Sequence, residues 1–212
     1  MDVKAESLLQ SRWARLLTTL GCPVNRIEPA FTDLREHYES SGRYYHTLDH
    51  IGAVLDTVYR LGATEQTSAL LLATWFHDAI YDSRAGDNEE RSAGFARRTL
   101  QSLGVDEAIL REAERLILLT KTHMPSPDDR LGQILVDADL AVLGVPEAEY
   151  DIYARAIRKE YAWVPDEAYR AGRRGVLERF VQRPRIYRTE AMFAQAEEAA
   201  RRNLRREIES LS

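Results

Sequence analysis

The sequence predicts an all-α protein, and three observations support that prediction. Apolar side chains recur at the three- to four-residue spacing of a helix almost from one end of the chain to the other. No stretch alternates apolar and polar residues for long enough to indicate a strand. Glycines and prolines fall between the periodic segments, where helices are expected to end. At 212 residues, the chain is long enough to bury a sizeable core in a single domain.

The helical segments can be placed in order from their periodicity and from the residues that interrupt it. The run from about 65 to 80 is apolar on nearly every side, so it is predicted to be the central buried helix. Asp87 or Asn88 is expected to cap the next helix, whose first turn contains Glu89 and Glu90. The pattern indicates nine or ten helices, at about 4–20, 30–40, 48–61, 65–80, 88–103, 106–120, 130–143, 147–161, 166–182 and 189–211.

Bulk composition limits the expected location of the protein. Cys22 is the only cysteine, so no internal disulfide can form, which suits a reducing compartment. The N-terminus lacks the charged-then-apolar pattern of a secretion signal. No apolar run approaches the roughly 18 to 20 residues that a membrane span needs. We therefore expect a cytoplasmic protein that does not enter a membrane.

Charge is unevenly distributed along the chain. Residues 1–154 contain 15 basic and 25 acidic side chains, whereas residues 155–212 contain 14 basic and 9 acidic ones. Of the 29 cations 26 are arginines, which suit forked contacts with phosphate or carboxylate. They either cover solvated helix faces or complete an anion-binding site. The net charge of −5 argues against a nucleic-acid polymer as the main partner.

The most informative local feature is the pair His77-Asp78, which lies at the end of the apolar run 70–80. Burying an imidazole and a carboxylate is costly unless a partner satisfies them. A divalent metal ion would satisfy both groups at once, with one nitrogen and one oxygen ligand. The pair therefore predicts where the chemistry of this protein takes place.

Three further segments carry side chains that could bind a metal or a substrate. His46 and His50 are four residues apart, so they would share a helix face if the helix begins early enough. His123 follows a predicted helix, two residues after Lys121. The fourth segment contains two acids in apolar surroundings, Asp137 and Asp139. Residues two apart on a helix point in different directions, so only one of these acids is expected to reach an ion.

Four motifs give the chain a resemblance to small bacterial proteins of the HD-domain superfamily of metal-dependent phosphohydrolases. The motifs are Tyr45-His46-Thr-Leu-Asp-His50, Phe76-His77-Asp78-Ala-Ile-Tyr81, Asn88-Glu89-Glu-Arg-Ser92-Ala93 and Asp137-Ala-Asp139-Leu140. The resemblance rests on all four motifs, which occur in this order and lie on expected helices. The resemblance implies a single-domain helical bundle of the HD-domain type over residues 1–212. Its metal-site core would span about 40–145, with the helices of 147–211 packed on it.

The resemblance implies four metal ligands, namely His50, His77, Asp78 and one acid of the last motif. Asp139 is the preferred acid, because superfamily members usually have an Ala-Asp pair there that opens a helix, but Asp137 stays open. Such a site mixes nitrogen and oxygen ligands and leaves positions free. One divalent ion is expected, with Mn²⁺, Fe²⁺, Co²⁺ or Ni²⁺ favoured, Mg²⁺ possible and Zn²⁺ less suitable.

The implied activity is hydrolysis of a phosphate ester or anhydride of a nucleotide or other small phosphorylated metabolite, through a metal-activated water. Asp78 would bind the ion and orient this water, and Glu89 would act as an acid or base or as an outer partner. The resemblance does not distinguish a monomer from a homodimer, so we expect one or the other. The residues considered for substrate binding are His46, Lys121, His123, Arg158 and Arg185, each of which could instead serve the fold.

Two other functions remain open at this point. A metal-holding protein that senses a nucleotide without turning it over would have the same ligands. A di-iron oxygenase of the same fold would usually need six protein ligands, and this sequence offers a poor set. The preferred prediction is therefore the hydrolase.

Overall fold

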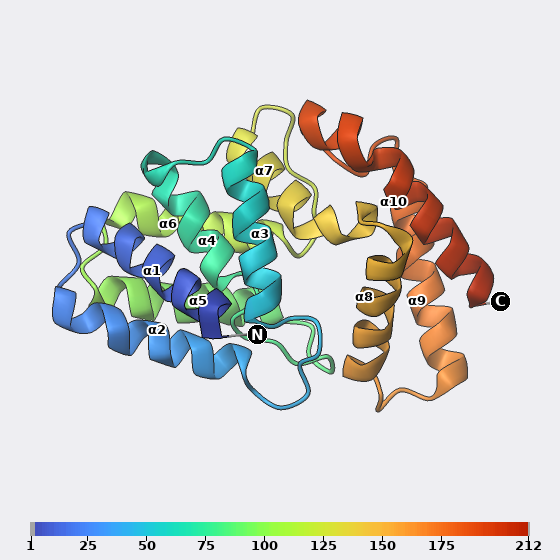
Figure 1. Cartoon of the computed structure of the whole chain (residues 1–212), viewed down its shortest axis with the longest axis horizontal. Helices are drawn as coiled ribbons and strands as arrows, with labels where there is room; N and C mark the ends of the chain where they lie inside the picture. The colour runs from blue at the N-terminus through green and yellow to red at the C-terminus, as the bar shows by residue number, and fades with distance from the viewer. Residues whose placement is uncertain (1–2, 212) are drawn as a thin grey trace.

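The computed structural model describes residues 3–211, and within that range it contains ten α-helices, two short 3₁₀ helices and no strand (Figure 1). The prediction of an all-α fold is thus confirmed. The elements are α1 (Val3–Thr19), α2 (Val24–Tyr38), α3 (Leu48–Arg60), η1 (Glu65–Thr67), α4 (Ser68–Phe76), α5 (Asn88–Ser102), α6 (Glu107–Leu119), α7 (Arg130–Asp139), η2 (Leu140–Gly144), α8 (Glu147–Glu160), α9 (Asp166–Val181) and α10 (Glu190–Ser210).

Three helices differ from the sequence prediction in their bounds, and one of them, expected at 130–143, is α7 followed by η2. α2 begins at Val24 rather than near residue 30, and it contains Pro29 in its interior. The reason is tertiary packing: Ile27 and Phe31 are buried on one face of this helix, and the Trp13 indole N–H donates to the carbonyl of Ile27 at 3.0 Å. The predicted helix at 65–80 is η1 followed by α4, which ends at Phe76. His77 and Asp78 therefore lie in the turn just beyond the helix.

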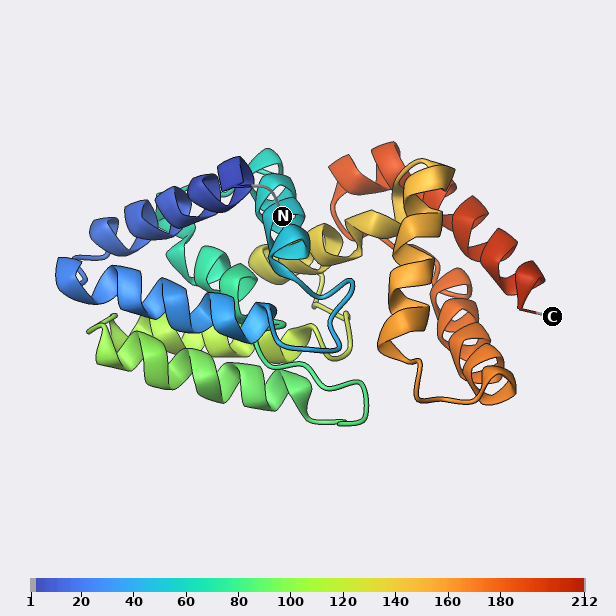
Figure 2. The same ribbon diagram turned by 60° about the horizontal axis from the view of Figure 1, so that its bottom comes forward.

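The described helices bury two apolar cores. The first is formed by α1–α7 and includes the edge-to-face pair Trp13 and Trp75, whose ring centroids are 5.5 Å apart. The second is formed by the end of α7, η2 and α8–α10, and includes Leu204. α7 serves both cores, with Leu135 in the first and Val136 in the second. Figure 2 shows α7 and η2 connecting the two groups of helices.

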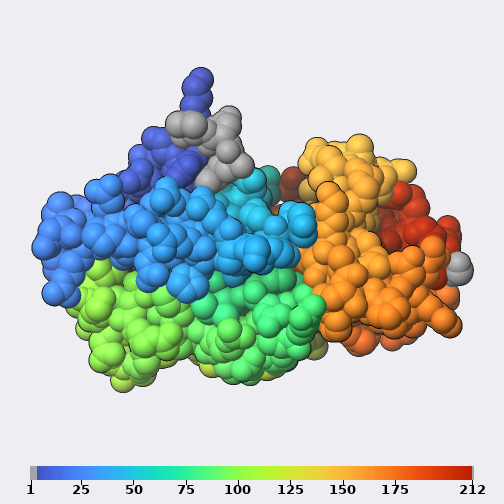
Figure 3. All heavy atoms as spheres, turned by 90° about the horizontal axis from the view of Figure 1, so that it is seen from below, coloured from blue at the N-terminus to red at the C-terminus, as the bar shows by residue number. Residues whose placement is uncertain are grey.

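The two groups also meet away from α7. In the loop after α4, the Ser83 hydroxyl donates to the carbonyl of Glu160 at 2.9 Å and accepts from the Trp163 indole N–H at 2.8 Å. Figure 3, the view from below, shows green atoms of the first group touching orange atoms of the second group. Within residues 3–211, no helix is long and apolar enough to cross a membrane.

Candidate metal centre

The structure brings together four side chains from three places in the first group of helices. His50 lies in the first turn of α3, His77 and Asp78 directly follow α4, and Asp139 is the last residue of α7. Asp139 thus leads from α7 into η2 instead of opening a regular α-helix. α4 is buried on every side, so its end delivers His77 and Asp78 to the interior. These four are the residues that the HD-domain resemblance implied as ligands.

The donor atoms of these residues have the spacing that one ion requires. His50 Nε2, His77 Nε2, Asp78 Oδ2 and Asp139 Oδ1 all lie within 4.8 Å of one another. Five of the six pairs are 3.2 to 3.5 Å apart. Four ligands at about 2.1 Å from one ion would be separated by about 3.0 to 3.4 Å. The cluster can therefore hold a divalent metal ion.

Hydrogen bonding fixes which nitrogen of His77 faces the cluster. His77 Nδ1 lies 3.0 Å from the backbone carbonyl of Thr74, which can only accept, so this nitrogen carries the proton. The lone pair of the neutral ring is then on Nε2, the atom that belongs to the cluster. An outer partner of this kind is typical of metal-binding histidines, because it orients the ring and sets the tautomer.

α5 holds the segment that follows the dyad. The Ser92 hydroxyl accepts from the backbone N–H of Ile80 at 3.0 Å and donates to its carbonyl. The Asn88 side-chain amide bonds both the N–H and the C=O of Asp82 at 3.0 and 2.9 Å. The polar residues of the third motif therefore fix the loop beyond Asp78, and they place Glu89 on the wall of a cleft.

The cluster strongly favours positive charge at its centre. Burial opposes a charged imidazole, but the carboxylates of Asp78 and Asp139 outweigh it and raise the pKa of His77 well above its ordinary value. Burial would likewise raise the pKa of Asp78, yet His77, His46 and His50 hold it well below its usual range. A metal ion would replace protons here, so metal binding should release protons and weaken as the pH falls.

His123 contacts the cluster from the outside. Its Nε2 lies 2.8 Å from Asp139 Oδ2, the carboxylate oxygen that does not belong to the cluster. The backbone of His123 is left-handed, with φ of 53°, which is uncommon for a residue other than glycine. Arg183 bonds the carbonyls of Thr122 and His123 at 3.1 and 3.3 Å and so holds this turn. The position suits a residue that orients Asp139.

Replacing His123 by alanine is expected to weaken metal binding about 10- to 100-fold, because Asp139 would lose the partner that orients it. The dissociation constant can be measured by calorimetric titration with Mn²⁺. His37→Ala is a matched control, since this half-exposed histidine stacks on Phe95, 4.3 Å away, and does not contact the cluster. Equal affinity in the two variants would contradict the role assigned to His123.

Asp137 lies elsewhere, in a fully buried site. Its Oδ1 accepts the backbone N–H of Arg188 at 2.7 Å, and its Oδ2 accepts both the N–H and the hydroxyl of Thr189 at 2.7 Å. Burial raises the pKa of Asp137, although these hydrogen bonds partly offset the effect. Asp137 thus anchors the start of α10 and has no oxygen left over for the cluster.

Two side chains that the sequence analysis did not single out brace the site. The Arg43 guanidinium donates to the carbonyls of His46, Asp78 and Ala79 at 2.7 to 2.8 Å, which ties the segment before α3 to the segment after α4. Glu160, the last residue of α8, performs a similar task for the segment before α3. Both act on backbone groups far away in the sequence, so neither carries a local signal of its role.

Glu160 is the direct partner of His46. Its Oε1 accepts the backbone N–H groups of Tyr44, Tyr45 and His46 at 2.7 to 3.0 Å, and its Oε2 lies 2.7 Å from His46 Nδ1. Burial would raise the pKa of Glu160, but these hydrogen bonds lower it to about 2. The ring of His46 stacks on Tyr81 at 4.1 Å. His46 therefore lines the cleft and is not one of the four donor residues of the cluster.

Glu160→Gln is expected to lower the free energy of unfolding at neutral pH by about 3 kcal/mol. A fall in pKa from 4.5 to about 2 contributes stability that is present above pH 4.5 and lost as the pH falls towards 2. The difference between wild type and the variant should therefore shrink across that window. Urea unfolding at a series of pH values measures it, and parallel profiles for the two proteins would refute the assignment.

A cleft of about 780 Å³ lies between the two groups of helices. The four cluster residues do not line it, but their neighbours His46 and His123 do, whereas His50 and Asp139 line a separate pocket of about 540 Å³. His46, Glu89, Lys121 and His123 line the first wall of the cleft, so the structure brings these four sequence candidates together. Lys121 pairs with Glu90 and bonds the carbonyl of Gly86 at 3.0 Å. Its ammonium group is thus already engaged at the rim.

Arg158 and Arg185 do not join this cleft. Arg158 closes the α8–α9 connection, where it bonds the carbonyls of Tyr161 and Val164 and the Asp166 carboxylate. Arg185 pairs with Glu190 and lines a different pocket. The guanidinium groups on the second wall of the cleft belong instead to Arg173, Arg179 and Arg183.

These three arginines differ in their partners. Arg173 is nearly buried and bonds Glu207 at 2.8 Å. In the part of the chain that the structure describes, Arg179 and Arg183 form no ion pair with a carboxylate. Burial and the neighbouring guanidinium groups of Arg188 and Arg179 lower the pKa of Arg183. Two cations without an acidic partner thus face the cleft.

Comparison with known proteins does not identify a family for this chain. No protein-family model matches the chain, and no curated protein is significantly similar to it. Membership of the HD-domain superfamily therefore stays a prediction. The geometry supports a buried cluster of two histidines and two aspartates that could bind a metal ion.

Proposed function

We propose that this protein is a metal-dependent phosphohydrolase of the HD-domain type, acting on a phosphate ester or anhydride of a nucleotide or another small phosphorylated metabolite. The supporting observation is the four-atom cluster, whose neighbours His46 and His123 line a cleft with unpaired arginines on its far wall. Two nitrogen and two oxygen donors favour Mn²⁺, Fe²⁺, Co²⁺ or Ni²⁺, and Mg²⁺ is also compatible. Zn²⁺ is less favoured, because no thiolate belongs to the set.

The two carboxylates of the cluster are suited to different tasks. When bound, a divalent ion polarises a phosphate oxygen and lowers the pKa of a coordinated water. Asp78 Oδ1 makes no hydrogen bond to any described residue, so it can orient the attacking water. The second oxygen of Asp139 is occupied by His123. Glu89, on the cleft wall, supplies a further carboxylate for proton transfer.

The lining of the cleft suits a phosphorylated compound with a ring system. Arg179 and Arg183 would neutralise charge on the phosphoryl oxygens. Tyr161, Trp163 and Phe180 line the same space, and Trp163 is 48% exposed. An aromatic face that is open to a cleft can stack against a nucleobase. This combination favours a nucleotide among the small phosphorylated substrates.

Metal analysis followed by a substrate screen tests the proposal. The purified full chain is expected to bind about one divalent ion. It should then release phosphate or pyrophosphate from members of a nucleotide panel in the presence of Mn²⁺, Co²⁺, Ni²⁺ or Mg²⁺, and removal of the metal by a chelator should stop the release. A chain that binds no divalent ion contradicts the proposal. Metal binding without turnover of any compound would favour a sensor, and iron-dependent oxygen uptake would favour an oxygenase.

A further inference from the structure

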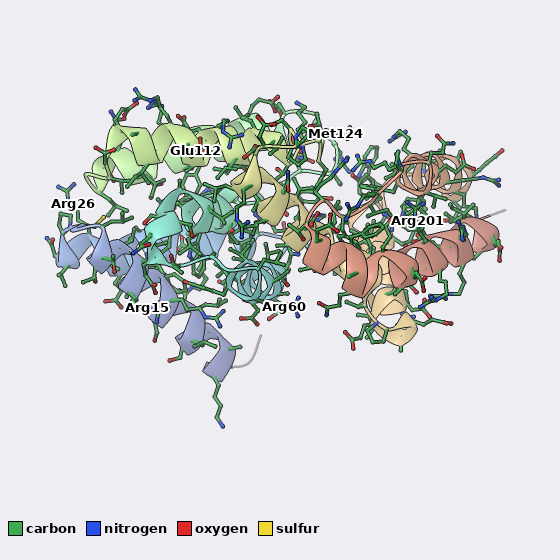
Figure 4. All side chains as sticks on the ribbon, turned by 90° about the horizontal axis from the view of Figure 1, so that it is seen from above. Arg15, Arg26, Arg60, Glu112, Met124 and Arg201 are labelled. Carbon is green, nitrogen blue, oxygen red and sulfur yellow. The ribbon has the colours of Figure 1, made fainter. Side chains whose placement is uncertain are left out.

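A second pocket, of about 650 Å³, lies on another face of the molecule and is lined by four arginines. They come from three places in the chain: Arg60 ends α3, Arg130 begins α7, and Arg185 and Arg188 precede α10. Figure 4 views this face, with Arg60 and Met124 labelled on either side of the start of α10. Among the described residues, Glu190 is the only one with a carboxylate that lines the pocket. A strongly positive pocket thus occurs in a protein whose net charge is −5.

Most of this positive charge is unpaired. Arg185 bonds Glu190 at 2.8 Å, whereas Arg60, Arg130 and Arg188 form no ion pair within residues 3–211. Arg60 donates to the Thr57 hydroxyl, and Arg188 donates to the sulfur of Met124. Guanidinium groups held close together repel one another, and an anion between them would relieve that repulsion.

Two of the arginines that line the pocket also have N–H groups without an acceptor. The Nε and Nη2 atoms of Arg185 and the Nε atom of Arg188 are buried without a hydrogen-bond partner among the described residues. A buried donor without an acceptor costs about 1 to 3 kcal/mol, and more when it is charged. The Arg185 guanidinium also lies over the Phe193 ring, 3.7 Å from its centroid, so its positive charge is held in place beside the pocket.

The start of α10 adds further donors. Thr189 caps this 21-residue helix, and Thr189, Glu190 and Ala191 line the pocket. The first N–H groups of a helix have no partner inside the helix, and they favour anions. Arginine forks and helix N–H groups together match the oxygens of phosphate groups.

We propose that this pocket is a second binding site, separate from the metal centre, that takes a small anion with two or three linked phosphates. The charge fits, since three unpaired guanidinium groups face an anion of about three or four negative charges. His50 lies in the first turn of α3 and Arg60 ends this helix, so the pocket lies about 15 Å along the helix from the metal ligand. The proposal does not depend on phosphohydrolase activity, because no residue of the pocket belongs to the cluster.

Calorimetric titration of the full chain with inorganic triphosphate tests this site. Asp78→Ala removes a ligand of the metal centre, and this variant is expected to keep one binding site for triphosphate. The double variant Arg60→Ala/Arg130→Ala should bind at least about tenfold more weakly, because two charged hydrogen-bond donors are lost. Both side chains are exposed, so the fold should not change.

The matched control is the double variant Arg98→Ala/Arg205→Ala, which removes the same charge from two exposed arginines outside the pocket. Its affinity should stay within about twofold of wild type. Equal affinities for the two double variants would overturn the proposal, and so would loss of all triphosphate binding in Asp78→Ala. Tighter binding of a single-stranded oligonucleotide than of triphosphate would overturn the assignment to a small anion.

Discussion

Asp78→Ala is expected to abolish metal binding and with it any phosphatase activity. Asp78 Oδ2 is 3.3 Å from His77 Nε2 and 3.4 Å from His50 Nε2, so its loss removes one of the four donors and half of the negative charge. Loss of an outer partner already costs about 10- to 100-fold in metal affinity. A direct ligand that also orients the attacking water should cost more in both affinity and turnover. Elemental analysis and phosphate release provide the two readouts.

Asp82→Ala provides a control for the Asp78 experiment. Asp82 lies four residues further along, in the loop that Asn88 holds. Within residues 3–211, its side chain accepts only the N–H of Arg84, at 2.9 Å. The control should bind the same amount of metal as wild type. If Asp78→Ala kept both its metal content and its activity, the metal centre and the proposed chemistry would be wrong together. Loss of activity with full metal content would instead assign Asp78 to water orientation alone.

The paired variants Asp137→Ala and Asp139→Ala should have opposite effects. Asp139→Ala removes a cluster oxygen, so it is expected to lose the ion. Asp137→Ala should keep the ion but lower the free energy of unfolding by about 3 to 5 kcal/mol, because it leaves the N–H groups of Arg188 and Thr189 buried without an acceptor.

Metal stoichiometry and urea unfolding of the metal-free proteins separate these two outcomes. Both variants are aspartate-to-alanine changes two residues apart on one helix, so each serves as the control for the other. Metal loss in Asp137→Ala with retention in Asp139→Ala would reverse the assignment. The structural reason for the expected result is that the two side chains leave α7 in different directions, towards different cores.

Local patterns predicted the helices, and the resemblance to the HD-domain superfamily implied that the four cluster residues lie together. His77 and Asp78 were conspicuous because they end a run that is otherwise apolar, and α4 is indeed buried on every side. The choice between Asp137 and Asp139 could not be made from spacing alone. It depends on which neighbour each carboxylate meets, and Arg188 is 51 residues away from Asp137 in the sequence.

The bracing residues could not be predicted for the same reason. Arg43 bonds the carbonyl of Asp78, 35 residues away, and Glu160 bonds the N–H of Tyr45, 115 residues away. Neither lies in an apolar run or in a spacing that indicates a ligand. Arg158 and Arg185 were considered as substrate contacts. In the structure, Arg158 instead bonds the backbone of the α8–α9 connection, and Arg185 pairs with Glu190 and lines the second pocket. Tertiary contacts, rather than local pattern, decide which arginine faces the cleft.

The two apolar cores have a consequence for how such a protein can diversify. The four cluster residues come from α3, the turn after α4 and the end of α7, in the group of helices that forms the first core. Arg179, Arg183 and the aromatic residues of the opposite wall come from α9, the segment directly after it and the α8–α9 connection. Under the proposed function, substitutions in α9 would therefore change which compound is accepted while the four donors of the cluster stay unchanged.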